Sequence, residues 1–284
     1  MRPSGTSRRA LAAVAAAPVI LLLLWAGAGA GAGCSSGGAA GEGGAGGLGP
    51  GMPPAKVDPM DLISDFEEGR ALVLPLGTPA RGGSWYSYND GAGTCLQSPA
   101  HGTVYYASTS SVPPPGVSRG RALHASWNAC STWGAGVGAD FNRAVPDAGA
   151  TTTAPRVPYD LSGYAGISFW AMAMPGNSTM VRAKVVMRIS TQIEDGGACD
   201  ESILGVDKCG DEWGEAFSLP GDGSWKQVMI RFSDAAFAQE KGLNGAIWGQ
   251  PFPWNPADVL GIQFQSVAAG GLYDFWIDDV SLIR

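Results

Sequence analysis

The stretch Tyr273–Arg284, YDFWIDDVSLIR, decides how the rest of the chain is interpreted. Aromatic and β-branched residues in a short run without helical spacing predict a β-strand. Two adjacent acids, Asp278 and Asp279, stand in its middle. An ionised carboxylate inside a core is costly unless it is paired or bound to a metal. The stretch therefore predicts a buried strand whose acids need a partner elsewhere in the chain.

The same kind of pattern continues over residues 57–284. Short apolar runs alternate with clusters of Gly, Pro, Asn and Asp, and helical periodicity is nearly absent. This pattern is typical of an all-β sandwich, and the length suits one large domain. We expect one short helical turn, in SDAAFAQEKG at 233–242.

The N-terminal segment has the layout of a secretory signal, in which Arg8 and Arg9 precede a long apolar run that ends near Cys34. GAGC followed by two serines resembles the lipobox of bacterial lipoproteins, whose cysteine becomes the lipidated first residue. The alternatives are an uncleaved anchor and plain secretion. We predict a signal over 1–33 and a lipidated cysteine with a flexible Gly/Ala/Ser-rich tether over 34–56. The protein would then be exported and anchored at an outer membrane or cell surface.

The net charge excludes some classes of binding partner, and the cysteines predict disulfides within the fold. The chain has 18 basic and 25 acidic residues, and its formal net charge is −7. An acidic chain argues against nucleic acid and anionic membrane surfaces as partners. Contact with a membrane is therefore expected only through the lipid. We also expect the protein to be a monomer. Four further cysteines in an exported chain favour two disulfides. Cys199 and Cys209 enclose a short loop and are predicted to pair, which leaves Cys95 with Cys130, although the sequence permits other pairings.

Several predicted strands alternate apolar with polar side chains. A polar outer face is expected of any solvated antiparallel sheet. Amides and guanidinium groups on adjacent strands also suit the hydroxyl groups of a sugar, which need both donors and acceptors. The side chains predicted to line such a face are Asp140, Asn142, Arg182, Lys184, Gln227, Arg231, Gln263 and Gln265.

Aromatic residues give a second indication of a sugar-binding surface. Exposed rings stack on the apolar faces of flat ligands. The candidates are Trp85, Tyr86 and Tyr88 in GSWYSYNDG, and Trp248 and Trp254 in the Pro-rich AIWGQPFPWNP. The alternative is that such rings belong to the core, and for Trp85 the core is the stronger interpretation.

Motifs for catalysis are scarce. Neither of the two histidines belongs to a metal-binding pair, and the sequence has no G-x-S-x-G elbow and no phosphate-cradling loop. Paired carboxylates for glycoside hydrolysis leave no local signature. A hydrolase using Asp140 or Glu215 therefore remains an alternative, but we predict no catalytic residue.

Three segments carry a family resemblance: DLISDFEEG at 61–69, YDLSGYAGISFWA at 159–171 and FWIDDVSLI at 275–283. They look like the galactose-binding-domain-like jelly roll of family-eleven carbohydrate-binding modules and of complex I intermediate-associated proteins. The resemblance covers about residues 60–284. It implies a jelly-roll sandwich of two antiparallel sheets and a non-catalytic surface lipoprotein that binds a polysaccharide or oligosaccharide. The alternatives are a glycan-active hydrolase and a structural or protein-binding envelope lipoprotein.

The same resemblance implies a structural calcium ion, because the first and last strands of such modules often share one. Carried over by position, Glu67 and Asp278 are the side-chain ligands. Calcium prefers carboxylate oxygens, which would explain acids in a buried strand. Strand alternation places Asp279 on the opposite side, although a bulge would exchange the two roles. In the alternative, one of the two acids is solvated and the other bonds a neighbouring loop.

Overall fold

The computed structural model describes residues 58–69, 72–101, 108–109, 120–143, 154–240 and 249–284. The predicted signal, Cys34, the tether and Trp248 lie outside these residues. Export and lipidation therefore stay predictions. Within the described ranges, no helix is long and apolar enough to cross a membrane.

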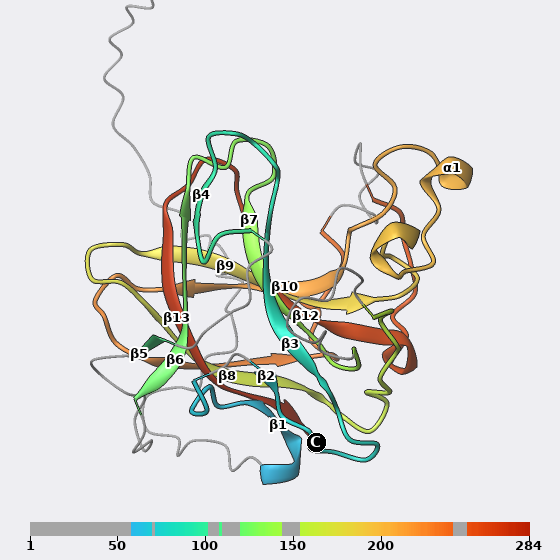
Figure 1. Ribbon diagram of the computed structural model, residues 1–284, viewed down its shortest axis with the longest axis horizontal. Helices are drawn as coiled ribbons and strands as arrows, with labels where there is room; N and C mark the ends of the chain where they lie inside the picture. The colour runs from blue at the N-terminus through green and yellow to red at the C-terminus, as the bar shows by residue number, and fades with distance from the viewer. Residues whose placement is uncertain (1–57, 70–71, 102–107, 110–119, 144–153, 241–248) are drawn as a thin grey trace, which may run out of the picture. The chain divides into compact units, whose positions relative to one another are not determined.

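The protein is an all-β jelly-roll sandwich of two antiparallel sheets, as predicted (Figure 1). The seven-stranded sheet has the order β11-β8-β13-β6-β4, with β1 paired to β13 and β5 paired to β6. Its strands are β1 Leu62–Ser64, β4 Leu96–Ser98, β5 Ser108–Thr109, β6 Arg121–Asn128, β8 Gly166–Ala173, β11 Lys226–Arg231 and β13 Tyr273–Ile283.

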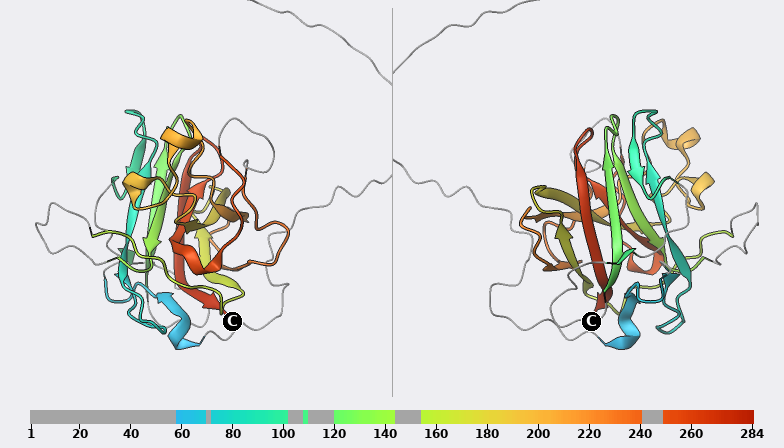
Figure 2. Two further views of the ribbon diagram at one scale, coloured as in Figure 1. Left: turned by 90° about the vertical axis from the view of Figure 1, so that its right-hand side faces the viewer. Right: turned by 60° about the vertical axis from the view of Figure 1, so that its left-hand side comes forward.

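The six-stranded sheet has the order β10-β9-β12-β7-β3-β2. Its strands are β2 Leu72–Val73, β3 Gly83–Asn89, β7 Ala135–Asp140, β9 Thr179–Met187, β10 Trp213–Leu219 and β12 Val259–Ser266. Figure 2 shows β3 and β7 running side by side, in agreement with their antiparallel pairing.

Helical structure in the described residues is confined to short turns outside the sheets. They are η1 Pro59–Asp61, η2 Ile193–Asp195, α1 Glu201–Leu204 and η3 Pro256–Asp258. The helical turn expected at 233–242 is wrong for its described part, because residues 232–237 form non-helical turns and bends and Ala238 bridges to Gly214. The α-helix begins instead after Asp200, whose carboxylate accepts a hydrogen bond of 2.9 Å from the backbone N–H of Ser202. A carboxylate at this position satisfies one of the free N–H groups at the start of a helix.

The inner faces of the two sheets meet in an aromatic core. The ring of Phe169 in β8 lies 5.1 Å from that of Phe217 and 4.9 Å from that of Phe264, centroid to centroid, in edge contacts. Trp85 stacks on Phe264 at 6.0 Å and is 1% exposed. Its indole N–H donates to the hydroxyl of Ser64 at 2.8 Å, so the buried donor is satisfied. The prediction that Trp85 stacks on a sugar is therefore wrong, and its alternative as a core residue holds.

Strand β13 contains a bulge at its two acids. Its register with β8 shifts between the pair Asp278–Trp170 and the pair Ser281–Ser168, which adds one residue to β13. Asp279 has a φ of 47°, as expected where a strand is kinked. The residues on either side of the acids, Ile277 and Val280, both belong to the core. Strict alternation of side chains therefore fails here. Two residues, both acidic, stand between consecutive inward-facing residues, where a regular strand has one.

Both predicted disulfides are present. Cys95–Cys130 ties the start of β4 to the turn after β6. Cys199–Cys209 closes the loop that carries α1, and both of its cysteines are buried. Each bridge therefore fixes a loop at the edge of a sheet.

Candidate functional site

Outward-facing residues of the six-stranded sheet form two neighbouring rows, each crossing from β3 through β7 and β12 to β9. We call this surface the Tyr–Gln face. Its first row consists of Tyr86, Gly138, Gln263 and Lys184, and its second row consists of Tyr88, Gly136, Gln265 and Arg182. Residues that the sequence analysis selected from three separate strands thus meet on one surface.

The tyrosine rings lie across the glycines of β7. A methyl group on Gly136 would come within 2.5 Å of Cζ of Tyr88, and one on Gly138 within 2.9 Å of Cζ of Tyr86. No side chain larger than hydrogen therefore fits beneath the rings. The two ring centroids are 6.0 Å apart with their planes inclined by 45°, and both side chains are half-buried. The result is an aromatic surface lying along the sheet.

A hydrogen-bond network fixes the amides beside these rings. The hydroxyl of Tyr88 lies 3.1 Å from Oε1 of Gln263 and 3.3 Å from Oε1 of Gln265, and it can donate to either. Nε2 of Gln263 donates to the hydroxyl of Tyr86 at 3.1 Å. Nζ of Lys184 donates to Oε1 of Gln265 at 2.9 Å. The amide groups are therefore oriented before any ligand binds.

Asp140 lies beside the face but is engaged in ion pairs. It is 3% exposed, with Oδ2 3.0 Å from a guanidinium nitrogen of Arg143 and Oδ1 2.9 Å from Nε of Arg156. The contact to Arg156 is not directed along an N–H, so it is an ion pair rather than a hydrogen bond. The guanidinium of Arg156 also lies 5.4 Å from the ring centroid of Tyr86. Burial, together with the charge of Asp140, raises the pKa of Tyr86 to about 12, so its hydroxyl stays protonated at neutral pH.

The side of the face at β9 and β10 rests on a buried polar cluster. Lys184 is 7% exposed, and burial lowers its pKa, while the charge of Glu212 opposes that shift. Glu212 is buried and accepts hydrogen bonds from the hydroxyls of Ser190 and Thr191 and from the backbone N–H of Met187. Lys184 was predicted to bind a ligand directly. Its burial instead makes it a support that orients Gln265.

Other predicted ligand residues lie away from the Tyr–Gln face. Gln227 and Arg231 belong to β11 of the seven-stranded sheet. Strand alternation indicates the side of a strand but not the sheet that holds it, so their assignment to one face with Gln263 and Gln265 is wrong.

Trp254 also lies away from the Tyr–Gln face. The ring of Trp254 packs 5.0 Å from both Phe232 and Phe237, centroid to centroid, in a cluster against the core. Asn142 follows β7 and bridges to Gly82, and its carbonyl accepts from Val157 at 2.9 Å. The role of Trp254 is therefore structural, whereas the ligand role of Asn142 stays a prediction. Trp248 lies outside the described residues.

Two residues that border the face were not among the predicted ligand residues. Trp133 lies 5.9 Å from Tyr88, centroid to centroid, with planes inclined by 30°. Arg156 covers Tyr86 from the other direction. The only sequence signal for Trp133 was an aromatic residue shortly after Cys130. Arg156 stands outside every strand and gave no signal.

The acids of β13 lie in a different place. Asp278 is 1% exposed, and its Oδ1 accepts from the backbone N–H of Asp279 at 2.8 Å, whereas its Oδ2 has no hydrogen-bond partner. Burial and the charges of Asp279, Glu67 and Asp65 raise the pKa of Asp278 to about 8. A buried carboxylate oxygen without a donor, flanked by further acids, fits a hard cation. The predicted ligands Glu67 and Asp278 are thus compatible with calcium.

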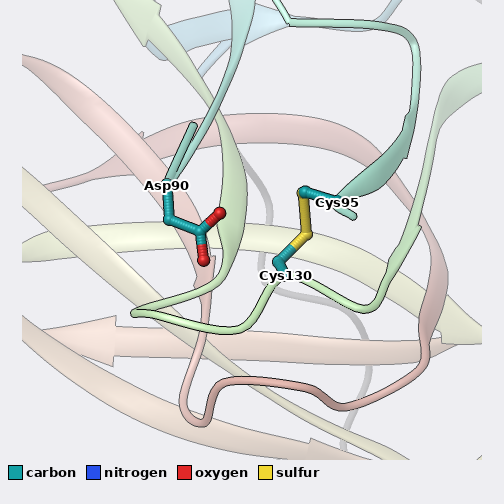
Figure 3. A group of neighbouring side chains, drawn as sticks. All are labelled: Asp90, Cys95 and Cys130. Atoms are coloured by element: carbon teal, nitrogen blue, oxygen red, sulfur yellow. A yellow bond between two sulfur atoms is a disulfide. The ribbon is translucent and has the colours of Figure 1, made fainter. Parts of the chain in front are cut away.

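Another cluster resembles a metal site only by distance. Among the described residues, Asp90, Cys95 and Cys130 are the group of acids and cysteines whose ligand atoms lie within 4.8 Å of one another. Figure 3 shows that the two cysteines form a disulfide, so neither sulfur is a thiolate. Asp90 instead accepts hydrogen bonds from the backbone of the turn that follows Cys130. The cluster therefore lacks the thiolates of a cysteine metal site, and it clamps that turn.

Solved structures with similar folds include carbohydrate-binding modules. The family 11 module from Clostridium thermocellum in complex with a β-1,3-1,4-mixed-linked tetrasaccharide is 19% identical, covers 78% of this chain and 94% of its own, and has a TM-score of 0.40. The family 30 module of a cellulosomal cellulase from Clostridium thermocellum is 14% identical, covers 70% and 91%, and has a TM-score of 0.36.

An exo-β-agarase is 10% identical over 78% of this chain and 25% of its own, with a TM-score of 0.40. No family model and no curated protein matches the sequence. The similarity to family 11 modules expected from the sequence is therefore found among solved structures. Identities and TM-scores this low transfer no ligand and no activity to this chain.

The raised pKa of Asp278 predicts a pH-dependent stability. The folded protein holds this proton more tightly than the unfolded chain does. In metal-free protein, the free energy of unfolding should therefore fall as pH rises from the ordinary value of 3.8 toward 8. The total loss is up to ~6 kcal/mol. Asp278→Asn keeps the shape without the charge, so it should flatten this slope in urea titrations with a chelator present.

The exposed Asp222 provides the matched control, because Asp222→Asn removes an acid whose charge is not among those that raise the pKa of Asp278. This variant should keep the wild-type slope. Equal slopes for wild type and Asp278→Asn would show that the carboxyl of Asp278 is not destabilised by burial.

Proposed function

We propose that the protein is a non-catalytic carbohydrate-binding protein whose Tyr–Gln face binds a polysaccharide or oligosaccharide. The observation that carries this proposal is the pair of tyrosine rings laid over Gly136 and Gly138, with the amides of Gln263 and Gln265 fixed beside them. A pyranose ring presents apolar C–H groups on its faces and hydroxyls around its rim. An aromatic surface bordered by amide donors and acceptors matches both features.

Preorganisation supports the same proposal. The amide of Gln263 is held between two tyrosine hydroxyls, and Gln265 is held by Lys184. A flexible side chain loses conformational entropy when a ligand binds, and this loss lowers the affinity. Side chains that are already fixed avoid this loss. This ordered network lies on the Tyr–Gln face, which is why the proposal rests on that face.

The state of the acids favours binding over hydrolysis. Glycoside hydrolysis requires two carboxyl groups on either side of the scissile bond. At the Tyr–Gln face, Asp140 forms ion pairs with two arginines. Glu212 is buried, and its carboxylate accepts hydrogen bonds from two hydroxyl groups. Burial and the charge of Asp234 raise the pKa of Glu215, as a general acid requires. Glu215, however, shares its side of β10 with the core residue Phe217 and not with the face.

The ligand prediction is tested on the full chain by affinity electrophoresis with barley β-1,3-1,4-glucan, laminarin, xyloglucan, xylan, galactomannan and agarose. At least one polysaccharide should retard the wild type. Tyr88→Ala should weaken that binding about tenfold, because an aromatic contact contributes on the order of 1 kcal/mol beyond its area. Gln227→Ala on the seven-stranded sheet should leave it unchanged.

Retardation by none of these polysaccharides would refute carbohydrate binding by this face. Release of reducing sugar in the same samples would favour the hydrolase instead. If Gln227→Ala weakened binding and Tyr88→Ala did not, the ligand would bind the other sheet.

We also propose a calcium ion between the turn after β1 and the bulge of β13, held by Glu67 and Asp278 with backbone carbonyls. The ion would neutralise the charge that raises the pKa of Asp278 and would give its free Oδ2 a partner. It would thereby tie the first strand to the last, which are already paired.

Calcium should raise the melting temperature of chelator-treated protein. A ligand that binds only the folded state at a hundredfold excess over its Kd stabilises by about 2.7 kcal/mol. Asp278→Asn should lose the response in differential scanning calorimetry, whereas Asp222→Asn should retain it. Identical melting curves in calcium and in chelator, starting from metal-free protein, would exclude the ion.

Finally, we propose that a lipid on Cys34 and the tether after it display the domain at a membrane surface. The full chain should partition into the detergent phase. Cys34→Ala should move it to the aqueous phase or leave the signal uncleaved. Mass spectrometry that finds an unmodified mature N-terminus at another residue would contradict lipidation.

A further inference from the structure

We propose that Trp133 is an additional ligand-stacking residue at one end of the Tyr–Gln face, and that Asp90 and the Cys95–Cys130 disulfide position it. This inference rests on the proposed function of the face. It names the residue that extends the binding surface and the contacts that hold this residue in place.

Trp133 is the most exposed of the tryptophans in the described part of the chain. Its side chain is 42% exposed, whereas Trp85 and Trp127 lie in the core and the others are half-buried. A large aromatic side chain in water forgoes the stabilisation that burial would give it. An exposed tryptophan beside a surface of other rings is typical of a site where a ligand completes the burial.

The ring of Trp133 extends the series of aromatic rings that Tyr86 and Tyr88 begin. The centroids of Tyr86 and Tyr88 are 6.0 Å apart, and those of Tyr88 and Trp133 are 5.9 Å apart. The angle between planes is 45° in the first pair and 30° in the second. Three rings at nearly equal spacing suit a ligand made of repeating rings. A sugar that already covers Tyr88 would bring its next unit over Trp133.

The turn that carries Trp133 is held from two sides (Figure 3). Oδ2 of Asp90 accepts from the backbone N–H of Thr132 at 2.7 Å and of Gly134 at 3.3 Å. The backbone N–H of Asp90 donates to the carbonyl of Gly134 at 3.0 Å. The disulfide to Cys95 fixes Cys130 at the start of the same turn.

Gly134 closes the turn in a conformation that other residues rarely adopt. Its φ is 103°, and a methyl group there would lie 1.9 Å from the hydroxyl oxygen of Ser266. The turn therefore has little freedom at either end. A ring presented by a rigid turn loses little conformational entropy on binding, which a flexible loop could not offer.

A second interpretation assigns Trp133 only a structural role, as a cover for the ring of Tyr88. The two roles differ in how binding depends on ligand length. A cover affects stability and all ligands alike, whereas a stacking residue affects only ligands long enough to reach it.

The experiment titrates the full chain by isothermal calorimetry with β-1,3-1,4-gluco-oligosaccharides of increasing length, or with those of whichever panel polysaccharide binds. Trp133→Leu keeps an apolar cover without an aromatic face, and Trp133→Tyr keeps a ring. Trp133→Leu should leave the shortest bound oligosaccharide unaffected and lose about tenfold in affinity for longer ones. Trp133→Tyr should retain most of the length dependence.

Two further variants test the positioning contacts and specificity. The double variant Cys95→Ser/Cys130→Ser should show the same length-selective loss, since the ring remains but its turn is released. Trp225→Ala directly before β11 removes a half-buried tryptophan from the other sheet and should bind like the wild type at every length.

Equal affinities of wild type and Trp133→Leu at all lengths would overturn the role of Trp133 while leaving the face intact. A uniform loss at all lengths would also overturn it, in favour of the structural cover. If the wild type itself binds no oligosaccharide, the proposed function fails, and the inference fails with it.

Discussion

The space above the β7 backbone at Gly136 and Gly138 governs the surface of the six-stranded sheet. Because these positions carry no side chain, Tyr86 and Tyr88 can lie down across the strand and reach the amides of β12 with their hydroxyls. Any larger residue would lift the rings and break these contacts. Glycine inside a strand is less favourable than other residues, because it packs poorly and loses more backbone entropy on folding. The flat face is therefore obtained at some expense of strand stability.

That constraint explains why the face could be predicted only in part. Period-two alternation placed Gln263 and Gln265 correctly, and it also separates Tyr86 from Trp85 in the run GSWYSYN. The same alternation selected Gln227 wrongly, because a strand's pattern does not encode which sheet it joins. Residues outside the strands, such as Trp133 and Arg156, were not assigned to the face, because long-range contacts, and not local periodicity, decide what they face.

The fold itself was largely readable from the sequence, since short apolar runs and turn residues require an antiparallel sandwich. The even number of cysteines after Cys34 and the short loop between Cys199 and Cys209 also gave both bridges correctly. The bulge at Asp279 was not readable in this way. It lies where the partner on one edge of β13 changes from β6 to β1, and it brings two acids together where alternation alone would separate them.

The place of β13 has a consequence for how the domain is made. It is the C-terminal strand, yet it lies between β6 and β8 and also pairs with β1. Until Tyr273–Ile283 has left the ribosome, no strand joins β8 to β6 in the seven-stranded sheet. The edges of β6 and β8 that later pair with β13 therefore stay unpaired. Such edges recruit other chains. The seven-stranded sheet therefore cannot close until Tyr273–Ile283 has been synthesised, and a nascent chain stalled before Tyr273 exposes two strand edges rather than forming a smaller domain.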